Sequence, residues 1–196
     1  MAALVNLDIN RAWYDKKRPV LTNFALTLNA GETMTIMGPS GVGKTTILSI
    51  IAGLHKGYEG RVLVGGSVGL IPQKACLPPF CTVFDNITLL ARAKGQKPDR
   101  AAVLSLLDEL GLSGMEGRYP ATLSGGQYRR IALGQALYAQ PDILLMDEPF
   151  SALDAGTKAD IIALLLRMTR ARRTAIVFVT HDRAEAELVG GDVKVL

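Results

Sequence analysis

The sequence is poor in the residues that define several familiar classes of protein. Two cysteines, two histidines and one tryptophan occur in 196 residues. Cys76 and Cys81 are too few for a disulfide framework and lack the partners of a metal site, so we expect reduced thiols in a cytosolic protein. His55 and His181 are likewise too few for a metal cluster. These scarcities argue against a small secreted disulfide domain and against a zinc module.

Long apolar runs and long charge runs are missing too. No stretch reaches the roughly 18 apolar residues that cross a bilayer, and residues 1–10 lack the features of a secretory signal. Nucleic-acid binding needs concentrated basic surface with stacking aromatics, whereas net charge is +4 and the basic groups at 16–18 and 170–173 are short. We expect a cytosolic domain without a nucleic-acid partner. Its hydrophobic content of 48% leaves apolar surface for another protein.

The segment Gly38–Thr46 carries the strongest motif. It fits the pattern G-x-x-x-x-G-K-[ST], with Gly38, Gly43, Lys44 and Thr45 in the fixed places. Glycines let backbone N–H groups approach a triphosphate, the start of a helix offers positive partial charge, and Lys44 adds a full charge. The hydroxyl of Thr45 suits a bound Mg²⁺. The segment therefore predicts a site for a nucleotide triphosphate.

Hydrophobic periodicity predicts alternating strands and helices on both sides of this loop. The expected strands are 4–9, 20–28, 33–37, 61–64, 67–72, 143–146 and 174–179, with a charged turn at 15–18. The expected helices are 46–52, one capped by Thr82, one that opens at Pro98–Asp99 and stops at Gly111, 128–139, and one that follows Asp154. The continuous apolar run at 143–146 is typical of a parallel strand buried on both faces. We expect an α/β fold with a helical insertion at about 82–120 between parts of a parallel sheet.

Polar residues follow the ends of three predicted strands, where open α/β sheets bind ligands. Asp147 and Glu148 follow one strand; Asp147 suits Mg²⁺ held through water, and Glu148 suits the polarisation of an attacking water. His181 follows a second strand, where its position favours a contact to a γ-phosphate over a structural role. Gln73 closes a third strand and is a weak signal for a metal or a water.

Two further features each admit two interpretations. The segment Leu123–Gln127 has the sequence LSGGQ before a predicted helix. It forms either a second anion-binding helix end or an ordinary Ser/Gly cap. Trp13 is the only tryptophan, and it either stacks on an adenine ring or lies at the edge of the core. The position of Trp13 supports these two roles equally.

Taken in order, these motifs resemble those of the nucleotide-binding domain of ATP-binding-cassette (ABC) transporters. The matching segments, at typical spacings, are Gly38–Thr46, Gln73, Leu123–Gln127, Ile143–Pro149, Ser151–Asp154 and His181. The resemblance covers almost the whole chain, and Pro149–Asp154 is most similar to the solute-importer branch. It implies a P-loop NTPase fold of the ABC ATPase type, with a parallel core sheet, a small antiparallel β lobe and an inserted helical lobe. The implied domain is single, over 1–196, with a RecA-like core (1–81 and 140–196) and a helical lobe (about 82–139).

The resemblance further implies an ATPase that works as a pair of identical copies and powers solute transport. ATP would lie between the phosphate loop of one copy and the LSGGQ helix end of the other, and Asp154 would communicate across the dimer. The implied catalytic residues are Lys44, Gln73, Glu148 and His181, and the implied Mg²⁺ ligands are Thr45, Gln73 and Asp147. ATP would be bound by Trp13 (with Tyr14 as the fallback for stacking on adenine), Gly38, Ser40, Gly41, Gly43, Lys44, Thr45, Thr46, Ser124 and Gly126.

The implied partner is a membrane permease that docks on the helical lobe and on the apolar segment Leu77–Phe80. A solute-binding protein would complete the system, and the chain would lie peripherally on the cytoplasmic face of the cell membrane. Tyr128 and Gly134–Gln135 depart from the family pattern at positions that bear on coupling rather than on ATP binding. The chain ends soon after His181, so a minimal or shortened cassette is expected. The alternative function is a soluble ABC ATPase that acts on nucleic acid or the ribosome; a P-loop kinase or an inactive subunit fits the motifs less well.

Overall fold

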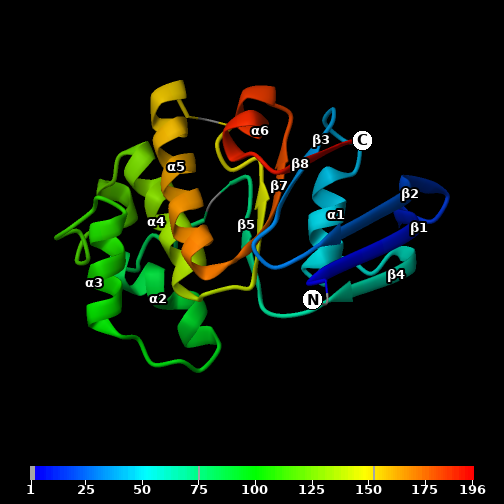
Figure 1. Cartoon of the computed structure of the whole chain (residues 1–196). Coiled ribbons are helices and arrows are strands. Elements are labelled where there is room, and N and C mark those ends of the chain that lie inside the picture. Colours follow the sequence, from blue (N-terminus) through cyan, green and yellow to red (C-terminus); the bar gives the residue numbers. More distant parts are fainter. Residues whose placement is uncertain (1–2, 75, 152) are drawn as a thin grey trace.

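The computed structural model describes residues 3–74, 76–151 and 153–196, so Ala152 of the predicted motif Ser151–Asp154 lies outside the described residues. The elements are β1 (Val5–Asp15), β2 (Arg18–Leu28), β3 (Thr33–Met37), α1 (Lys44–Ile51), β4 (Tyr58–Val64), β5 (Val68–Ile71), α2 (Val83–Ala93), α3 (Arg100–Glu109), the 3₁₀ helix η1 (Pro120–Thr122), α4 (Gly125–Tyr138), β6 (Ile143–Asp147), α5 (Ala155–Arg172), β7 (Ala175–Thr180), α6 (Arg183–Val189) and β8 (Asp192–Val195). They form a parallel sheet, an antiparallel sheet and a group of helices, which confirms the predicted α/β architecture (Figure 1).

The larger sheet has five parallel strands in the order β5-β6-β7-β3-β8. Side chains of a strand alternate between the two faces of its sheet, so the apolar central strands serve two cores. In β6, Ile143 and Leu145 join the core that contains α1 and the antiparallel sheet, whereas Leu144 and Met146 join the core that contains α2 to α5. The prediction of a parallel strand buried on both faces is therefore confirmed.

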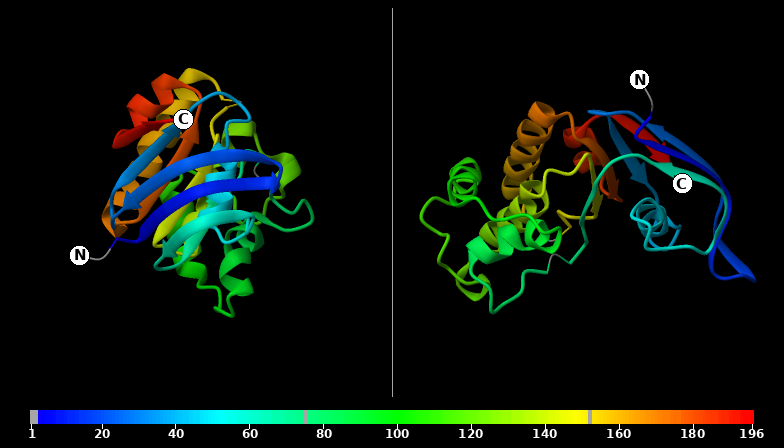
Figure 2. Two further views of the ribbon diagram at one scale, coloured as in Figure 1. Left: turned by 90° about the vertical axis from the view of Figure 1, so that its right-hand side faces the viewer. Right: turned by 90° about the horizontal axis from the view of Figure 1, so that it is seen from below.

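The smaller sheet is antiparallel, in the order β2-β1-β4. With α1 it lies on the opposite side of the parallel sheet from α2 to α5, as the view from below shows (Figure 2). The predicted turn at 15–18 is too long, because β1 continues through Trp13 and Tyr14 to Asp15 and β2 begins at Arg18. The hairpin therefore extends further than its sequence suggested.

The helices between 83 and 138 begin at polar caps, as predicted for the first two. Thr82 Oγ1 accepts the amide of Asp85 at 3.1 Å, and Asp99 accepts the amides of Ala101 and Ala102. These helices share one core with a face of the parallel sheet. Because a shared core marks no boundary between the helices and the sheet, the limits of the predicted helical lobe stay a prediction. None of the helices described combines the length and apolar character that a membrane span requires.

The last two elements were not predicted from the sequence. α6 has seven residues and β8 has four, which is too short for a clear periodic pattern. β8 is an edge strand that pairs with β3, from Met34 beside Asp192 to Met37 beside Val195. The strand that it joins, rather than its own sequence, determines where it forms.

The register of the parallel sheet brings the ends of four strands to one edge. β3 ends beside Thr180 of β7, β6 ends at Asp147 beside Val179, and β5 ends beside Met146. The predicted phosphate loop, Gln73, the two acids after β6 and the histidine after β7 follow these ends. The fold therefore collects residues that are far apart in the sequence.

Candidate active site

A cavity of about 320 Å³ opens at this edge of the sheet. Its walls come from the β1–β2 hairpin, the loop after β3, the start of α1 and the ends of β5 and β6. The lining residues are Tyr14, Val20, Ser40, Gly41, Gly43, Lys44, Thr45, Thr46, Gln73, Asp147 and Glu148. All of them except Val20 were singled out from the sequence.

The loop between β3 and α1 depends on glycines with left-handed backbone. Gly41 has a φ of +83° and Gly43 a φ of +107°. A β-carbon on Gly43 would lie 2.9 Å from the carbonyl oxygen of Val20, so only glycine fits. α1 then begins at Lys44, and the first N–H groups of a helix have no acceptor within the helix. The loop thus ends at a helix N-terminus that favours an anion.

The side chain of Lys44 is folded into this loop and is only 5% exposed. Its ammonium donates hydrogen bonds to the carbonyl oxygens of Gly38 (2.8 Å) and Pro39 (2.9 Å), and it lies 3.6 Å from Glu148 Oε1. These contacts hold a positive charge beside the helix N-terminus. That combination suits the β- and γ-phosphates of a nucleotide.

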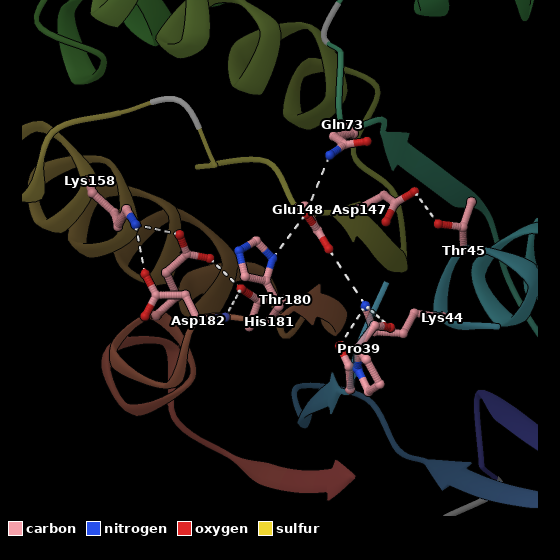
Figure 3. Close-up of polar contacts among 12 residues, drawn as sticks. Pro39, Lys44, Thr45, Gln73, Asp147, Glu148, Lys158, Thr180, His181 and Asp182 are labelled. Carbon is pink, nitrogen blue, oxygen red and sulfur yellow. Dashed lines mark hydrogen bonds and ion pairs between the residues drawn. The ribbon is translucent and has the colours of Figure 1, made fainter. Parts of the chain in front are cut away.

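Glu148 is the centre of the polar contacts at this site (Figure 3). Its Oε2 accepts a hydrogen bond from Gln73 Nε2 at 3.3 Å and lies 3.2 Å from Nδ1 of His181, while Oε1 faces Lys44. Glu148 has a φ of +42°, which is unusual for a residue with a β-carbon and costs roughly 1–2 kcal/mol. Its amide donates to the carbonyl of Val179 at 2.9 Å, which stabilises this turn. Four segments predicted to carry catalytic residues therefore meet at one carboxylate.

Asp147 and Thr45 form a second polar pair, in which Thr45 Oγ1 donates to Asp147 Oδ2 at 2.8 Å. Burial raises the pKa of Asp147; the hydrogen bond from Thr45 opposes this shift, and the charge of Glu148 adds to it. The described residues hold no group of three or more His, Cys, Asp or Glu suited to a metal ion. Thr45, Asp147 and Gln73 each carry a side-chain oxygen, and Mg²⁺ prefers a few oxygen ligands together with substrate phosphates.

The predicted stacking role of Trp13 does not match its position. Trp13 is absent from the cavity lining, and the guanidinium of Arg11 lies 5.3 Å from the centre of its ring. Tyr14 lines the cavity, is 68% exposed, and has its ring centre 4.6 Å from that of His55. The pairing of β1 with β2 is irregular at Trp13, and an irregularity of this kind changes which face a side chain takes. The structure places the fallback, Tyr14, at the cavity.

The LSGGQ helix end lies outside this cavity. Ser124 Oγ accepts the amide of Gln127 at 3.3 Å, and Gln127 Oε1 accepts the amide of Ser124 at 3.0 Å, so α4 begins at Gly125, before the predicted start at 128. Ser124 and Gly125 are exposed, and a β-carbon on Gly125 would meet no atom within 4 Å. Ser124 and Gly126 thus belong to a capped helix end that is open to the outside, and one copy of the chain does not bring them to its own phosphate loop.

Side chains of α4 hold the segment that follows Gln73. Arg129 donates to the carbonyl of Gln73 at 3.2 Å, and the hydroxyl of Tyr128 accepts the amide of Leu77 at 2.8 Å. Leu77 is 3% exposed and belongs to the core, so the prediction that it offers docking surface is wrong. Phe80, from the same predicted surface, is 92% exposed.

Two residues that depart from the family pattern also have defined contacts. Gln135 Nε2 donates to the backbone carbonyl of Asn86 at 2.9 Å, and the side-chain Nδ2 of the buried Asn86 donates to the carbonyl of Cys81 at 3.0 Å. A β-carbon on Gly134 would lie 2.7 Å from a methyl group of Leu110, so the absence of a side chain permits close packing there. The departures therefore stabilise the loop before α2 and the contact between α3 and α4.

A polar cluster beside His181 was not predicted from the sequence. Lys158 of α5 contacts Asp182 at 2.9 Å and Glu185 at 2.6 Å, and Thr180 Oγ1 donates to Glu185 at 2.6 Å. One signal was available, because Asp182 and Glu185 have the spacing of a helix cap with an acid three residues later. Lys158 comes from another helix and has no such local signal.

Comparisons with known proteins agree with this geometry. The family model described as ABC transporter matches residues 21–151. The chain is 41% identical to the aliphatic sulfonates import ATP-binding protein SsuB 2 of Burkholderia cenocepacia, over 98% of this chain and 73% of that protein. It is 42% identical to the sulfate/thiosulfate import ATP-binding protein CysA of Brucella melitensis, over 86% of this chain and 52% of that protein. Among solved structures, the dimeric structure of a bacterial ABC transporter cassette superposes with a TM-score of 0.83 at 30% identity, covering 98% of this chain and 94% of that one.

The fold and the site thus define an ATP-binding cassette, and the chain belongs to the ABC transporter family. It is an ATPase subunit whose activity is coupled to transport. The matches support this function over the alternative of a soluble ATPase that acts on nucleic acid or the ribosome.

Proposed function

We propose that this chain is the ATP-hydrolysing subunit of a solute importer, in which two copies enclose ATP and each copy completes the site of the other. The observation that carries the proposal is the convergence of Lys44, Gln73 and His181 on the carboxylate of Glu148. The pair of Thr45 and Asp147 lies in the same cavity. This is the set of groups that hydrolysis of a nucleotide triphosphate needs.

In this proposal each residue has a defined task. The amides at the start of α1 and the ammonium of Lys44 bind the triphosphate, and the ring of Tyr14 stacks on adenine. Glu148 accepts a proton from the attacking water, and His181, 58% exposed beside it, contacts the γ-phosphate. Phosphoryl transfer depends mainly on positioning and charge stabilisation, so the hydrogen bonds that hold these groups matter as much as the groups themselves.

The donor set also fits a magnesium ion. The hydroxyl of Thr45, the carboxylate of Asp147 and the side-chain oxygen of Gln73 would hold Mg²⁺. Bound Mg²⁺ would neutralise negative charge on the phosphate oxygens. Asp147 is ready for this role, because burial penalises its charge and a neighbouring cation would remove that penalty.

The need for a second copy follows from the position of the LSGGQ helix end. Ser124 and Gly126 line no part of the cavity of their own chain, yet Ser124 is exposed at a helix N-terminus, which favours anions. A second copy can bring this end to the phosphates. The dimeric cassette that resembles this chain supports such a pairing.

The exposed segment before α2 bears on the partners. Phe80 is almost fully exposed, on a segment that α4 ties to Gln73, so this surface suits a membrane permease that must communicate with the nucleotide. The chain would then lie peripherally on the cytoplasmic face of the membrane. The relatives named above import sulfonates, or sulfate and thiosulfate. We therefore infer a small sulfur oxyanion as the solute, delivered by a solute-binding protein.

A Glu148→Gln variant tests the enzymatic part of the proposal. ATP should drive this variant into a stable dimer, measured by light scattering after size exclusion, with turnover at least about 100-fold lower. A Lys44→Ala control should bind ATP poorly and stay monomeric. A Glu148→Gln variant that binds ATP but stays monomeric would contradict the proposal, as would a wild-type turnover per molecule that does not depend on protein concentration.

The solute has a separate test. The chain should co-purify with its membrane permease, and ATPase activity of that complex with its binding protein should rise on addition of an alkanesulfonate or of sulfate. Stimulation by an unrelated solute, such as a sugar or an amino acid, and by neither oxyanion, would contradict the solute class alone.

A further inference from the structure

A polar cluster outside the cavity lies beside His181, and the established activity does not account for it. Lys158 Nζ lies 2.6 Å from Glu185 Oε1 and donates to Asp182 Oδ2 at 2.9 Å (Figure 3). The side chain of Glu185 is 2% exposed and that of Lys158 is 16% exposed. Glu185 is therefore buried, whereas Lys158 is partly exposed and Asp182, at 35%, is more exposed still.

The cluster holds both neighbours of His181. On one side, Thr180 Oγ1 donates to Glu185 Oε2 at 2.6 Å and accepts the amide of Asp182 at 3.0 Å. On the other side, Asp182 accepts the ammonium of Lys158 and caps α6 through the amide of Ala184. The residue between them points toward Glu148, with its side chain 58% exposed. The backbone of His181 is thus fixed from both sides, while its ring remains accessible.

Lys158 also connects this loop to the start of α5. Its amide donates to the carbonyl of Asp154 at 2.9 Å, in the first turn of α5. Asp154 caps the same helix by accepting the amide of Thr157 at 3.0 Å. Lys158 therefore contacts Asp154 through its backbone amide and the loop of His181 through its side chain.

Stability alone does not explain an ion pair in which one partner, Glu185, is only 2% exposed. Removing charges from water costs free energy that a buried ion pair only partly recovers, and apolar residues of similar size often stabilise as well or better. What the pair provides is a defined geometry with short, directional bonds. Such geometry is valuable where a catalytic group must be held within a fraction of an ångström.

We infer that Lys158 is a positioning residue, which holds the loop of His181 in register with the start of α5 so that the imidazole reaches the γ-phosphate. The inference rests on the role proposed for His181. Lys158 touches neither ATP nor the attacking water; it acts through Thr180, Asp182 and Glu185.

Steady-state ATPase kinetics of the whole chain test this. Lys158→Met should lower kcat roughly 10- to 100-fold while KM for ATP changes less than about twofold. Lys158→Arg, which keeps the charge and the donors, should restore most of the activity. In a His181→Ala background, Lys158→Met should lower kcat no further, because its target is already gone. A residue with a merely structural role would add its loss to that of His181→Ala.

Two more variants guard against trivial loss of folding. Thr180→Val removes the hydroxyl without leaving a buried charge unpaired, and it should also lower kcat while KM is kept. Glu187→Gln on the same helix is the matched control, since Glu187 pairs with Arg183 at 3.3 Å on the exposed surface and should leave kcat unchanged. Thermal unfolding should show all variants folded at the assay temperature.

The outcomes separate the inference from the proposed function. Normal kcat in Lys158→Met beside an inactive His181→Ala would overturn the positioning role alone. Losses that multiply in the double variant would overturn it as well. Normal turnover in His181→Ala would overturn the role of His181, and the inference with it.

Discussion

The choice between Tyr14 and Trp13 is the sharpest prediction that the structure makes about nucleotide binding. The two rings are neighbours in β1, yet only Tyr14 lines the cavity, and the ring of Trp13 instead lies under the guanidinium of Arg11. Replacing each residue separately by alanine therefore removes one large ring at the cavity or one large ring away from it. Each variant serves as the control for the other.

The two variants should change different quantities: Tyr14→Ala the Kd for ATP, and Trp13→Ala the free energy of unfolding. Stacking of an aromatic ring on a base contributes about 1–3 kcal/mol, so Tyr14→Ala should raise the Kd for ATP roughly 5- to 150-fold. Its ring is 68% exposed, so we expect little change in the free energy of unfolding. Trp13→Ala loses a contact with Arg11 that is worth about 0.5–1 kcal/mol at an exposed site. It should lower stability and leave the Kd within about twofold.

Equilibrium titration with a fluorescent ATP analogue, in parallel with thermal unfolding of each variant, checks both expectations. Tyr14→Phe should bind nearly as tightly as the wild type, because it keeps the ring. A Kd that rises in Trp13→Ala and not in Tyr14→Ala would refute the assignment of the faces of β1. Weak binding by Tyr14→Phe would refute the stacking role, because the hydroxyl rather than the ring would then be the recognition element.

Three further predictions concern the loop, the helical segment and the sheet. Gly43→Ala should weaken ATP binding and lower the melting temperature, because it combines a left-handed backbone, which costs roughly 1–2 kcal/mol, with a β-carbon 2.9 Å from the carbonyl oxygen of Val20. Gly41→Ala is the control for the backbone cost, since Gly41 has a similar backbone and its β-carbon would meet no atom within 4 Å; equal stability losses in the two variants would contradict the steric argument. Tyr128→Phe should cost about 1–3 kcal/mol of stability and speed amide exchange at Leu77 while ATP affinity is unchanged; unchanged exchange would show that the hydroxyl does not hold that amide. The backbone amide of Ser67, and secondarily its hydroxyl, lower the pKa of Asp142. Its carboxylate therefore stabilises the fold above its ordinary pKa of about 4, and this stabilisation is lost as pH falls further. Asp142→Asn should lower the melting temperature relative to the wild type at pH 7, by an amount that shrinks toward pH 3; an amount that grows as pH falls would contradict this prediction.

Much of the fold could be predicted because its causes are local. The caps at Thr82 and Asp99 and the glycine at position 43 act over three or four residues, and they form as their spacing indicates. The apolar run of β6 predicted burial on both faces for the same reason. The members of the candidate site also followed from local patterns, because a phosphate loop and residues at strand ends are recognisable without knowing their neighbours.

What the sequence could not determine depends on contacts between distant segments. Irregularities in the pairing of β1 with β2 occur at Trp13, and a bulge changes which face a side chain takes, so alternation alone could not choose between Trp13 and Tyr14. Lys158 meets the loop of His181 only because α5 packs beside α6. The sequence by itself determined most of the candidate residues for the chemistry, since those motifs are local. The tertiary structure decided which ring faces the cavity and that Glu148 is the common partner of three segments, because strand register and helix packing are set by the whole chain.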